Sequence, residues 1–500
     1  MTERKQFISG LSWNTLTVVF QILIQTVYTG LLARMISPDS FALMGVVLSI
    51  MGFAEIFSQV GIGPAIIQRK DLHPQHLTGA FYTSLILGVS FTLVFVVTAP
   101  FFASSYHLPE LEPIMQVVST SFTISALAVV PRSLMLKEMR FKSFFMAGMI
   151  SIVGGNLIIG LLLAYFGYGV WAYVWALFAQ NALMTLAYWA LQPTRFPLKW
   201  QWAPTKELIG YGASSAVFNA LNYAATKVDV TILPKYVNAL PASNASTPLQ
   251  SAGIYERSAY VMSLPITIMA KLSDNVLFSG MSKMQEETER LRRLIAVATQ
   301  MLGLVVIPLV MFAVCFSNEI IAIYLGPKFM EAVPILQILM FAVIFRTLSR
   351  LADSLVRARN AVVKASWYKA FYLMIMIAGV YITIPYGTRW IAVSILFTTF
   401  VHYLMSIHLA HILIGSSWKV QLAATKPGLI LGAITLLIGT PFMMDWIFVE
   451  MAALLRLMVG ASLWAAALAL VVYKLPHWLI VNNNNPLDLI PIGIRNRLKL

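Results

Sequence analysis

The sequence predicts an all-α polytopic membrane protein with about fourteen transmembrane helices. Of its 500 residues, 59% are hydrophobic and only 11% are charged. Soluble proteins carry roughly 25% charged residues, so the charged side chains here are too few to cover several soluble domains. Two further observations support this prediction: apolar stretches of about 20 residues recur along the chain, and basic residues gather in alternate connecting segments.

The apolar stretches define the spans in chain order. The first stretch is too long for the core of a signal peptide, so we expect it to be retained as a transmembrane helix. The seventh and eighth stretches are unusually polar for membrane spans. The predicted spans lie near residues 8–33, 40–63, 77–101, 114–136, 144–166, 170–191, 207–234, 251–275, 293–317, 331–356, 364–386, 390–412, 427–447 and 451–474.

The basic residues predict the orientation of the chain. If the N-terminus is cytoplasmic, most Lys and Arg residues, Lys369 among them, fall in cytoplasmic segments. The opposite side then holds few, chiefly Arg34, Lys235, Lys328 and Arg389. Because cytoplasmic loops of membrane proteins are enriched in Lys and Arg, we expect both termini inside. The same rule accounts for the net charge of +15 without a nucleic-acid partner.

The first and seventh spans resemble each other when aligned with an offset of 201 residues. Their polar positions coincide: Gln21 with Asn222, Gln25 with Thr226, and Tyr28 with Asp229. Hydrogen bonding between packed helices explains one such stripe, but a stripe in both halves favours two lobes around a polar cavity. We predict six-helix lobes at 1–200 and 201–425, two extra helices at 426–475 and a short cytoplasmic tail at 476–500.

Span ten carries the most informative charges within the membrane. Arg346, Arg350, Asp353 and Arg357 are spaced by four, three and four residues, which places them on one helical face. Ionisable groups at this depth are costly and usually face a cavity or a partner. One interpretation is a basic track for an anionic substrate, formed chiefly by Arg346 and Arg350. In the other, Asp353 pairs with Arg350 or Arg357, and Arg357 marks the cytoplasmic end.

Other polar residues complete the candidate sites. For substrate binding in the cavity they are Lys227, Arg257, Asn222, Gln21 and Gln25; for ion coupling they are Glu55, Asp229, Glu256 and Asp274. Several of these charges have an opposite charge nearby in sequence, so internal salt bridges are the alternative. The histidines of span twelve lack nearby Cys, Asp or Glu, so we expect no metal site.

Sequence motifs of enzymes are missing. The chain contains no phosphate-binding loop of the G-x-x-x-x-G-K-[ST] type, no G-x-S-x-G and no H-E-x-x-H. We therefore expect a transporter with no catalytic residues and no cofactor. A membrane glycan polymerase or ligase is the alternative from another class, but it would usually present a substantial outer loop. The longest one predicted here, 236–250, has only about fifteen residues.

Several segments resemble one family of transporters. They are QVGIGPAIIQRKDL (59–72), VPRSLMLKEMRFK (130–142), FGYGVWA (166–172), GIYERSAY (253–260), YLGPK (324–328) and ILQIL (335–339). Together they are similar to segments of the polysaccharide transporter family, which contains the Wzx-type lipid-linked oligosaccharide flippases. This family belongs to the multidrug/oligosaccharidyl-lipid/polysaccharide exporter superfamily.

The resemblance implies a function and a mechanism. Two lobes would open alternately to either face of a bacterial inner membrane. A cationic cavity would carry the headgroup of an undecaprenyl-diphosphate-linked oligosaccharide to the outer leaflet for surface or exopolysaccharide synthesis. A glycan polymerase or chain-length regulator is an implied partner. A lipid II flippase and a drug or cation antiporter of the same superfamily are the alternatives, and the coupling ion stays open.

Overall fold

The computed structural model describes residues 3–58, 62–69, 71–194, 213–241, 247–444 and 451–474. Helices make up nearly all of this part of the chain, and no strand occurs in it, so the predicted all-α class is confirmed. Contacts divide the chain into two compact units, Met1–Glu256 (unit 1) and Arg257–Leu500 (unit 2). This division lies within one long helix, α11 (Pro248–Lys283), and the lobes at 1–200 and 201–425 stay a prediction.

The count of apolar helices bears on the number of spans. Among the described residues, twelve helices are long and apolar enough to cross a membrane. Two further long helices, α10 (Ala213–Ile232) and α11, occupy the positions of the polar seventh and eighth predicted spans. Twelve apolar helices and these two polar ones are compatible with fourteen spans, a number that stays a prediction.

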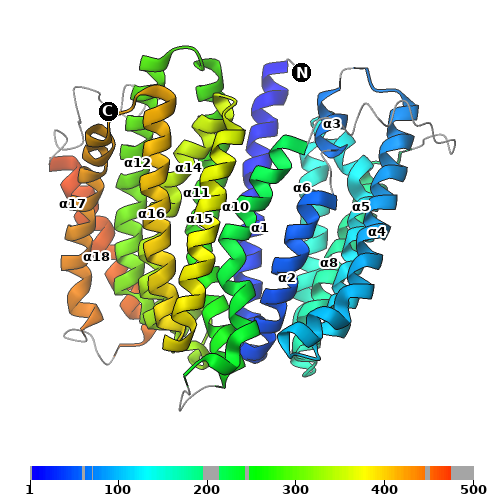
Figure 1. Cartoon of the computed structure of the whole chain (residues 1–500), viewed down its shortest axis with the longest axis horizontal. Coiled ribbons are helices and arrows are strands. Elements are labelled where there is room, and N and C mark those ends of the chain that lie inside the picture. Colours follow the sequence, from blue (N-terminus) through cyan, green and yellow to red (C-terminus); the bar gives the residue numbers. More distant parts are fainter. Residues whose placement is uncertain are drawn as a thin grey trace. The chain divides into compact units, whose positions relative to one another are not determined.

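Unit 1 is built from long helices joined by short turns (Figure 1). α4 begins with a proline and ends where His107 adopts a left-handed conformation, which a helix interior does not tolerate. The fifth span changes pitch midway and contains a nine-residue π-helix, η1 (Ile152–Gly160). The helices before α10 are α1 (Glu3–Met35), α2 (Pro38–Ser58), α3 (Ile62–Gln68), α4 (Pro74–Tyr106), α5 (Leu111–Lys137), α6 (Phe141–Ser151), α7 (Leu161–Tyr165) and α8 (Val170–Leu191).

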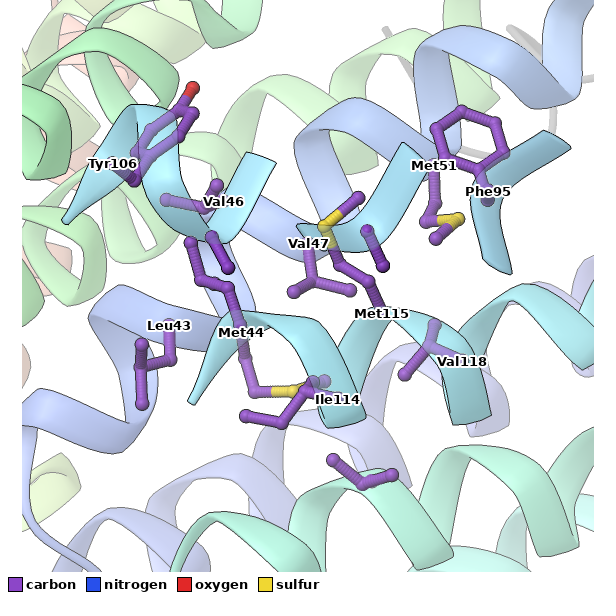
Figure 2. Close-up of a cluster of buried hydrophobic side chains, with 14 of the residues drawn as sticks. Leu43, Met44, Val46, Val47, Met51, Phe95, Tyr106, Ile114, Met115 and Val118 are labelled. Atoms are coloured by element: carbon purple, nitrogen blue, oxygen red, sulfur yellow. The ribbon is translucent and has the colours of Figure 1, made fainter. Parts of the chain in front are cut away.

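The largest apolar cluster described in unit 1 joins α2 to α4, α5 and α8. Figure 2 shows Met44 of α2 beside Ile114 of α5, and Val47 beside Met115. These side chains are 5% exposed or less, and they stabilise the helix packing through dispersion contacts, because lipid tails are as apolar as the side chains themselves. This cluster holds α2 firmly against the rest of unit 1.

Unit 2 continues the same construction from the end of α11. Its tightest helix pairing joins α12 to α17, where a side chain at Gly428 would collide with the backbone carbonyl of Gly303. Small residues allow membrane helices to approach this closely and to gain dispersion contacts. The remaining elements are α12 (Thr288–Cys315), α13 (Ser317–Tyr324), η3 (Pro327–Phe329), α14 (Ala332–Ala358), α15 (Val362–Thr383), η4 (Ile384–Tyr386), α16 (Thr388–Ile414), α17 (Trp418–Met443) and α18 (Ala453–Lys474).

Candidate functional site: a basic cluster in unit 2

Helix α14 carries the four charged residues that the sequence places on one face. Its proline at position 334 lies in the first turn, where a backbone N–H group has no partner within the helix, so the proline removes no hydrogen bond. Mostly apolar residues follow for three turns. It ends just before Asn360, which adopts a left-handed conformation with φ of 53°. Arg346 is the fifteenth of the 27 residues of α14, so it lies about 20 Å from either end at 1.5 Å per residue.

The guanidinium group of Arg346 is the most specific feature of this face. The residue is half-buried, and its Nε and Nη2 atoms are buried with no hydrogen-bond partner among the described residues. These two nitrogens form the edge of the guanidinium that donates two parallel hydrogen bonds to a carboxylate or a phosphate. Buried donors are normally satisfied, so this edge is suited to an anionic ligand.

Asp353 has a different partner from the two expected. Its Oδ2 atom lies 3.1 Å from Nζ of Lys369 in α15. The prediction of a cytoplasmic Lys369 therefore needs correction, since this side chain is 4% exposed and lies within a helix. The sequence contains a signal for this pair. Asp353 lies five residues before the end of α14, and Lys369 lies seven residues after the start of α15. Because the two helices form a hairpin, these positions come together.

His402 of α16 joins the same cluster. Its ring lies 4.2 Å, centroid to centroid, from that of Tyr372, which is one turn beyond Lys369 in α15. The charges of Lys369 and Arg346 both act on the His402 ring. Three helices, α14, α15 and α16, thus bring together Arg346, Arg350, Lys369 and His402 with one carboxylate, Asp353. We call these five residues the basic cluster.

The basic cluster provides fixed positive charge within membrane-spanning helices. Apart from His402, three cations face one carboxylate, which leaves an excess of two positive charges. In a low-dielectric interior such an excess is costly unless an anion offsets it. Among the described residues, no group of three or more His, Cys, Asp or Glu is placed to hold a metal ion. The arrangement therefore suits reversible anion binding.

The amides expected in the cavity serve helix packing in unit 1. Asn156 of η1 donates a hydrogen bond of 3.0 Å to Oε1 of Gln25, and the amide of Gln21 lies against Gly148 of α6. Hydrogen bonding between helices, the alternative considered for the polar stripe, thus accounts for Gln25. Asn222 is half-buried on α10.

The two other basic candidates have separate surroundings. Lys227 is half-buried on α10 in unit 1. Arg257 belongs to unit 2, is 2% exposed and places its guanidinium 4.7 Å from the ring centroid of Tyr260, a cation–π contact.

The four acidic candidates differ in burial. Asp229 is 1% exposed; its Oδ2 accepts a hydrogen bond of 2.8 Å from the Tyr255 hydroxyl, and its Oδ1 has no partner among the described residues. Glu256 is buried against Gly45 of α2. Glu55 is exposed, and the side chain of Asp274 lies outside the described residues. Asp229 therefore combines nearly complete burial with a defined hydrogen bond.

Helix α2 closes tightly against the start of α11 within unit 1. A side chain at Gly253 would collide with the backbone carbonyl of Pro38, so glycine is required for this approach. Beside it, Nε2 of Gln250 lies 3.3 Å from Oδ2 of Asp39. We call this contact between α2 and α11 the seam.

Comparison with known proteins places the chain among polysaccharide biosynthesis proteins. The model of a family described as "Polysaccharide biosynthesis protein" matches residues 31–334, more than half of the chain. Lipopolysaccharide biosynthesis protein WzxC of Escherichia coli (strain K12) is 24% identical over 384 residues, or 76% of each chain. Teichuronic acid biosynthesis protein TuaB of Bacillus subtilis (strain 168) is 24% identical over 392 residues, or 77% of this chain and 78% of TuaB.

Two kinds of solved structure share the fold. The lipid II flippase MurJ in an inward closed conformation matches with a TM-score of 0.71 and 13% identity, over 92% of this chain and 99% of MurJ. An inward-facing multidrug resistance transporter of the MATE family, in the MOP superfamily, matches with a TM-score of 0.64 and 15% identity. That match covers 81% of this chain and 98% of the transporter. At these identities the likeness concerns the fold alone.

Proposed function

The chain belongs to the polysaccharide biosynthesis protein family, and from this premise we propose that it is a transporter, not an enzyme, that flips a lipid-linked oligosaccharide. Its substrate would be an undecaprenyl-diphosphate-linked repeat unit, moved from the cytoplasmic to the outer leaflet of a bacterial inner membrane. The observation that carries this proposal is the buried, unpartnered Nε–Nη2 edge of Arg346 near the middle of α14. A diphosphate offers the pairs of oxygens that this edge binds.

The transport cycle that we propose begins with the headgroup of the lipid entering from the cytoplasm. The headgroup would meet Arg357 first and then Arg350 and Arg346 along α14, with Lys369 of α15 beside Asp353. Binding at the basic cluster would offset the charge that makes the crossing costly. A change of conformation would then release the glycan outside.

A leaflet assay in proteoliposomes tests this function. Fluorescent undecaprenyl-diphosphate oligosaccharide is placed in both leaflets, and its protection from an external quencher is followed over time. We expect the purified protein to equilibrate the lipid between leaflets. Lipid II and an organic cation, tested in the same vesicles, distinguish the two rival exporters. Unchanged sidedness in vesicles that contain folded protein would contradict the proposal, and conversion to longer glycan would indicate an enzyme.

Asp229 is the proposed residue for coupling transport to an ion gradient. This carboxyl group is 1% exposed in the seventh predicted span and accepts a hydrogen bond from the Tyr255 hydroxyl, and buried ionisable groups in membrane spans often mark the pathway of an ion. We expect Asp229→Asn to reduce gradient-driven accumulation in one leaflet at least tenfold, while passive equilibration changes by less than about threefold. The same vesicles, with and without a pH or sodium gradient, measure both quantities.

Tyr255→Phe serves as the matched variant for this prediction. It removes the hydrogen bond but keeps the carboxyl group, so we expect the coupling to weaken without disappearing. If Asp229→Asn responds to gradients as the wild-type protein does, Asp229 does not couple transport, and the flippase proposal is unaffected.

A further inference from the structure

Asp353 is the one carboxylate of the basic cluster, and it is bound to the least exposed of its cations. The side chain of Lys369 is 5% exposed, whereas that of Asp353 is 20% exposed. The two neighbouring charges on the same face of α14, Arg350 and Arg357, are both positive. Asp353 thus lies on a face that is otherwise basic, and it already binds one of the groups that an anionic substrate needs.

Stability alone does not explain this ion pair. Two charges that leave water lose solvation, and their attraction in a buried site often does no more than offset that loss. An apolar pair of similar size serves helix packing equally well or better. Asp353 also lies on the face of α14 that carries Arg346 and Arg350, the two residues that we expect to contribute most to anion binding. A role in ligand binding accounts for both its chemistry and its position.

We propose that Asp353 is an internal counter-ion that an anionic headgroup displaces from Lys369. This inference rests on the proposed function, because it adds a residue to the same site. In the empty state Asp353 offsets part of the positive charge; when a phosphate arrives, Lys369 exchanges its partner and binds the ligand. Departure of the ligand lets Asp353 recapture Lys369, which favours release.

The surroundings of Lys369 suit such an exchange of partners. Tyr372 lies one turn beyond Lys369 along α15, and its ring packs on that of His402 in α16. Asp353 has a shorter side chain and greater exposure. The carboxylate can therefore turn away while the ammonium group keeps its place. The ligand that fits is a phosphate or diphosphate, whose oxygens accept hydrogen bonds from Lys and Arg.

The inference makes an unusual prediction, because removal of a buried partner should improve binding. We expect Asp353→Asn to bind farnesyl diphosphate about tenfold more tightly than the wild-type protein, since Lys369 no longer has to leave a carboxylate. Lys369→Met should bind about tenfold more weakly, because it leaves Asp353 to repel the ligand. The double variant Asp353→Asn/Lys369→Met loses both charges and should return close to the wild-type affinity.

Titration calorimetry with the purified full-length protein in detergent measures these affinities. Asp71→Asn, the same change at an exposed loop position in unit 1, is the matched control and should bind as the wild-type protein does. Thermal unfolding of each variant identifies those that fail to fold. If Asp353→Asn does not fold, Lys369→Met and the double variant still test the inference, since the double variant should bind the diphosphate more tightly than Lys369→Met does.

The outcomes separate this inference from the proposed function. The inference is overturned if folded Asp353→Asn binds farnesyl diphosphate no more tightly than the wild-type protein does. It is also overturned if the affinities of the variants fall in the same order as their melting temperatures. In either case lipid flipping by the wild-type protein would still support the flippase proposal. Tighter binding by Asp353→Asn, together with absent flipping by the wild-type protein, would support the counter-ion and contradict the flippase.

Discussion

Replacing Arg346 by alanine is expected to slow the transfer of a diphosphate headgroup between leaflets by about 10- to 100-fold. The variant loses two hydrogen bonds to a charged ligand, each contributing about 1.5–3 kcal/mol, and every 1.4 kcal/mol corresponds to a factor of ten. Only part of that loss is expected in the rate, because the other cations of the basic cluster remain. The leaflet assay in proteoliposomes measures the rate directly.

The same substitution is expected to leave stability unchanged or to increase it. Nε and Nη2 of Arg346 make no hydrogen bond among the described residues, so alanine removes buried donors that cost free energy. Residues that serve a ligand often destabilise the empty protein in this way. An apparent melting temperature at or above that of the wild-type protein, combined with slow flipping, would distinguish a binding role from a structural one.

Two variants provide the controls for Arg346→Ala. Arg346→Lys keeps the charge but cannot donate two parallel hydrogen bonds from a planar edge, so an intermediate rate is expected. Arg293→Ala makes the same change at an exposed position of α12 and should flip the lipid at the wild-type rate. Wild-type rates for both substitutions at Arg346 would show that this residue does not bind the headgroup. The double variant Arg346→Ala/Arg350→Ala removes both central charges and should bring flipping to the background rate.

Apolar length and helical spacing were sufficient to predict most of the fold. Twelve of the predicted spans correspond to apolar helices because a membrane span requires about 20 apolar residues, a property of local sequence. α10 and α11 were harder to identify as spans because polar groups replace apolar ones along them. The location of the unit boundary depends on contacts such as that between Gly253 and Pro38, which no local pattern encodes.

The candidate site could be predicted only in part. The spacing of Arg346, Arg350 and Asp353 placed them on one face because all three belong to one helix. Lys369 and His402 come from two other helices, and their part in the cluster depends on how α14, α15 and α16 pack. Lys369 was assigned to the cytoplasm by a rule about basic residues near span ends, and that rule does not consider burial. The sequence signal for the contact between Lys369 and Asp353 is the register of the hairpin that α14 and α15 form.

The short helix α13 and the last described helix, α18, are joined by a second buried ion pair. Nε of Arg456 lies 3.2 Å from Oε1 of Glu319, and the two side chains are 11% and 6% exposed. Arg456 also donates a hydrogen bond from Nη2 to the backbone carbonyl of Phe442 at the end of α17. Trp464 of α18 adds a ring contact with Phe312. Few other side chains of α18 are buried, so its attachment depends on these contacts.

Replacing Glu319 by alanine is expected to destabilise the protein by about 3–5 kcal/mol, the usual cost of leaving a buried charge without its partner. Arg456 would keep only its bond to the Phe442 carbonyl among the contacts named above, so α18 should detach before the rest of unit 2 unfolds.

The double variant Glu319→Leu/Arg456→Met replaces both charges by apolar groups and should recover most of the stability, because helix packing needs no ion pair here. Thermal unfolding in detergent, with limited proteolysis at the start of α18, measures both effects. If Glu319→Ala melts as the wild-type protein does, the pair contributes nothing to holding α18, and its other contacts, such as the hydrogen bond of 3.1 Å from Nε1 of Trp464 to Thr435, hold it instead.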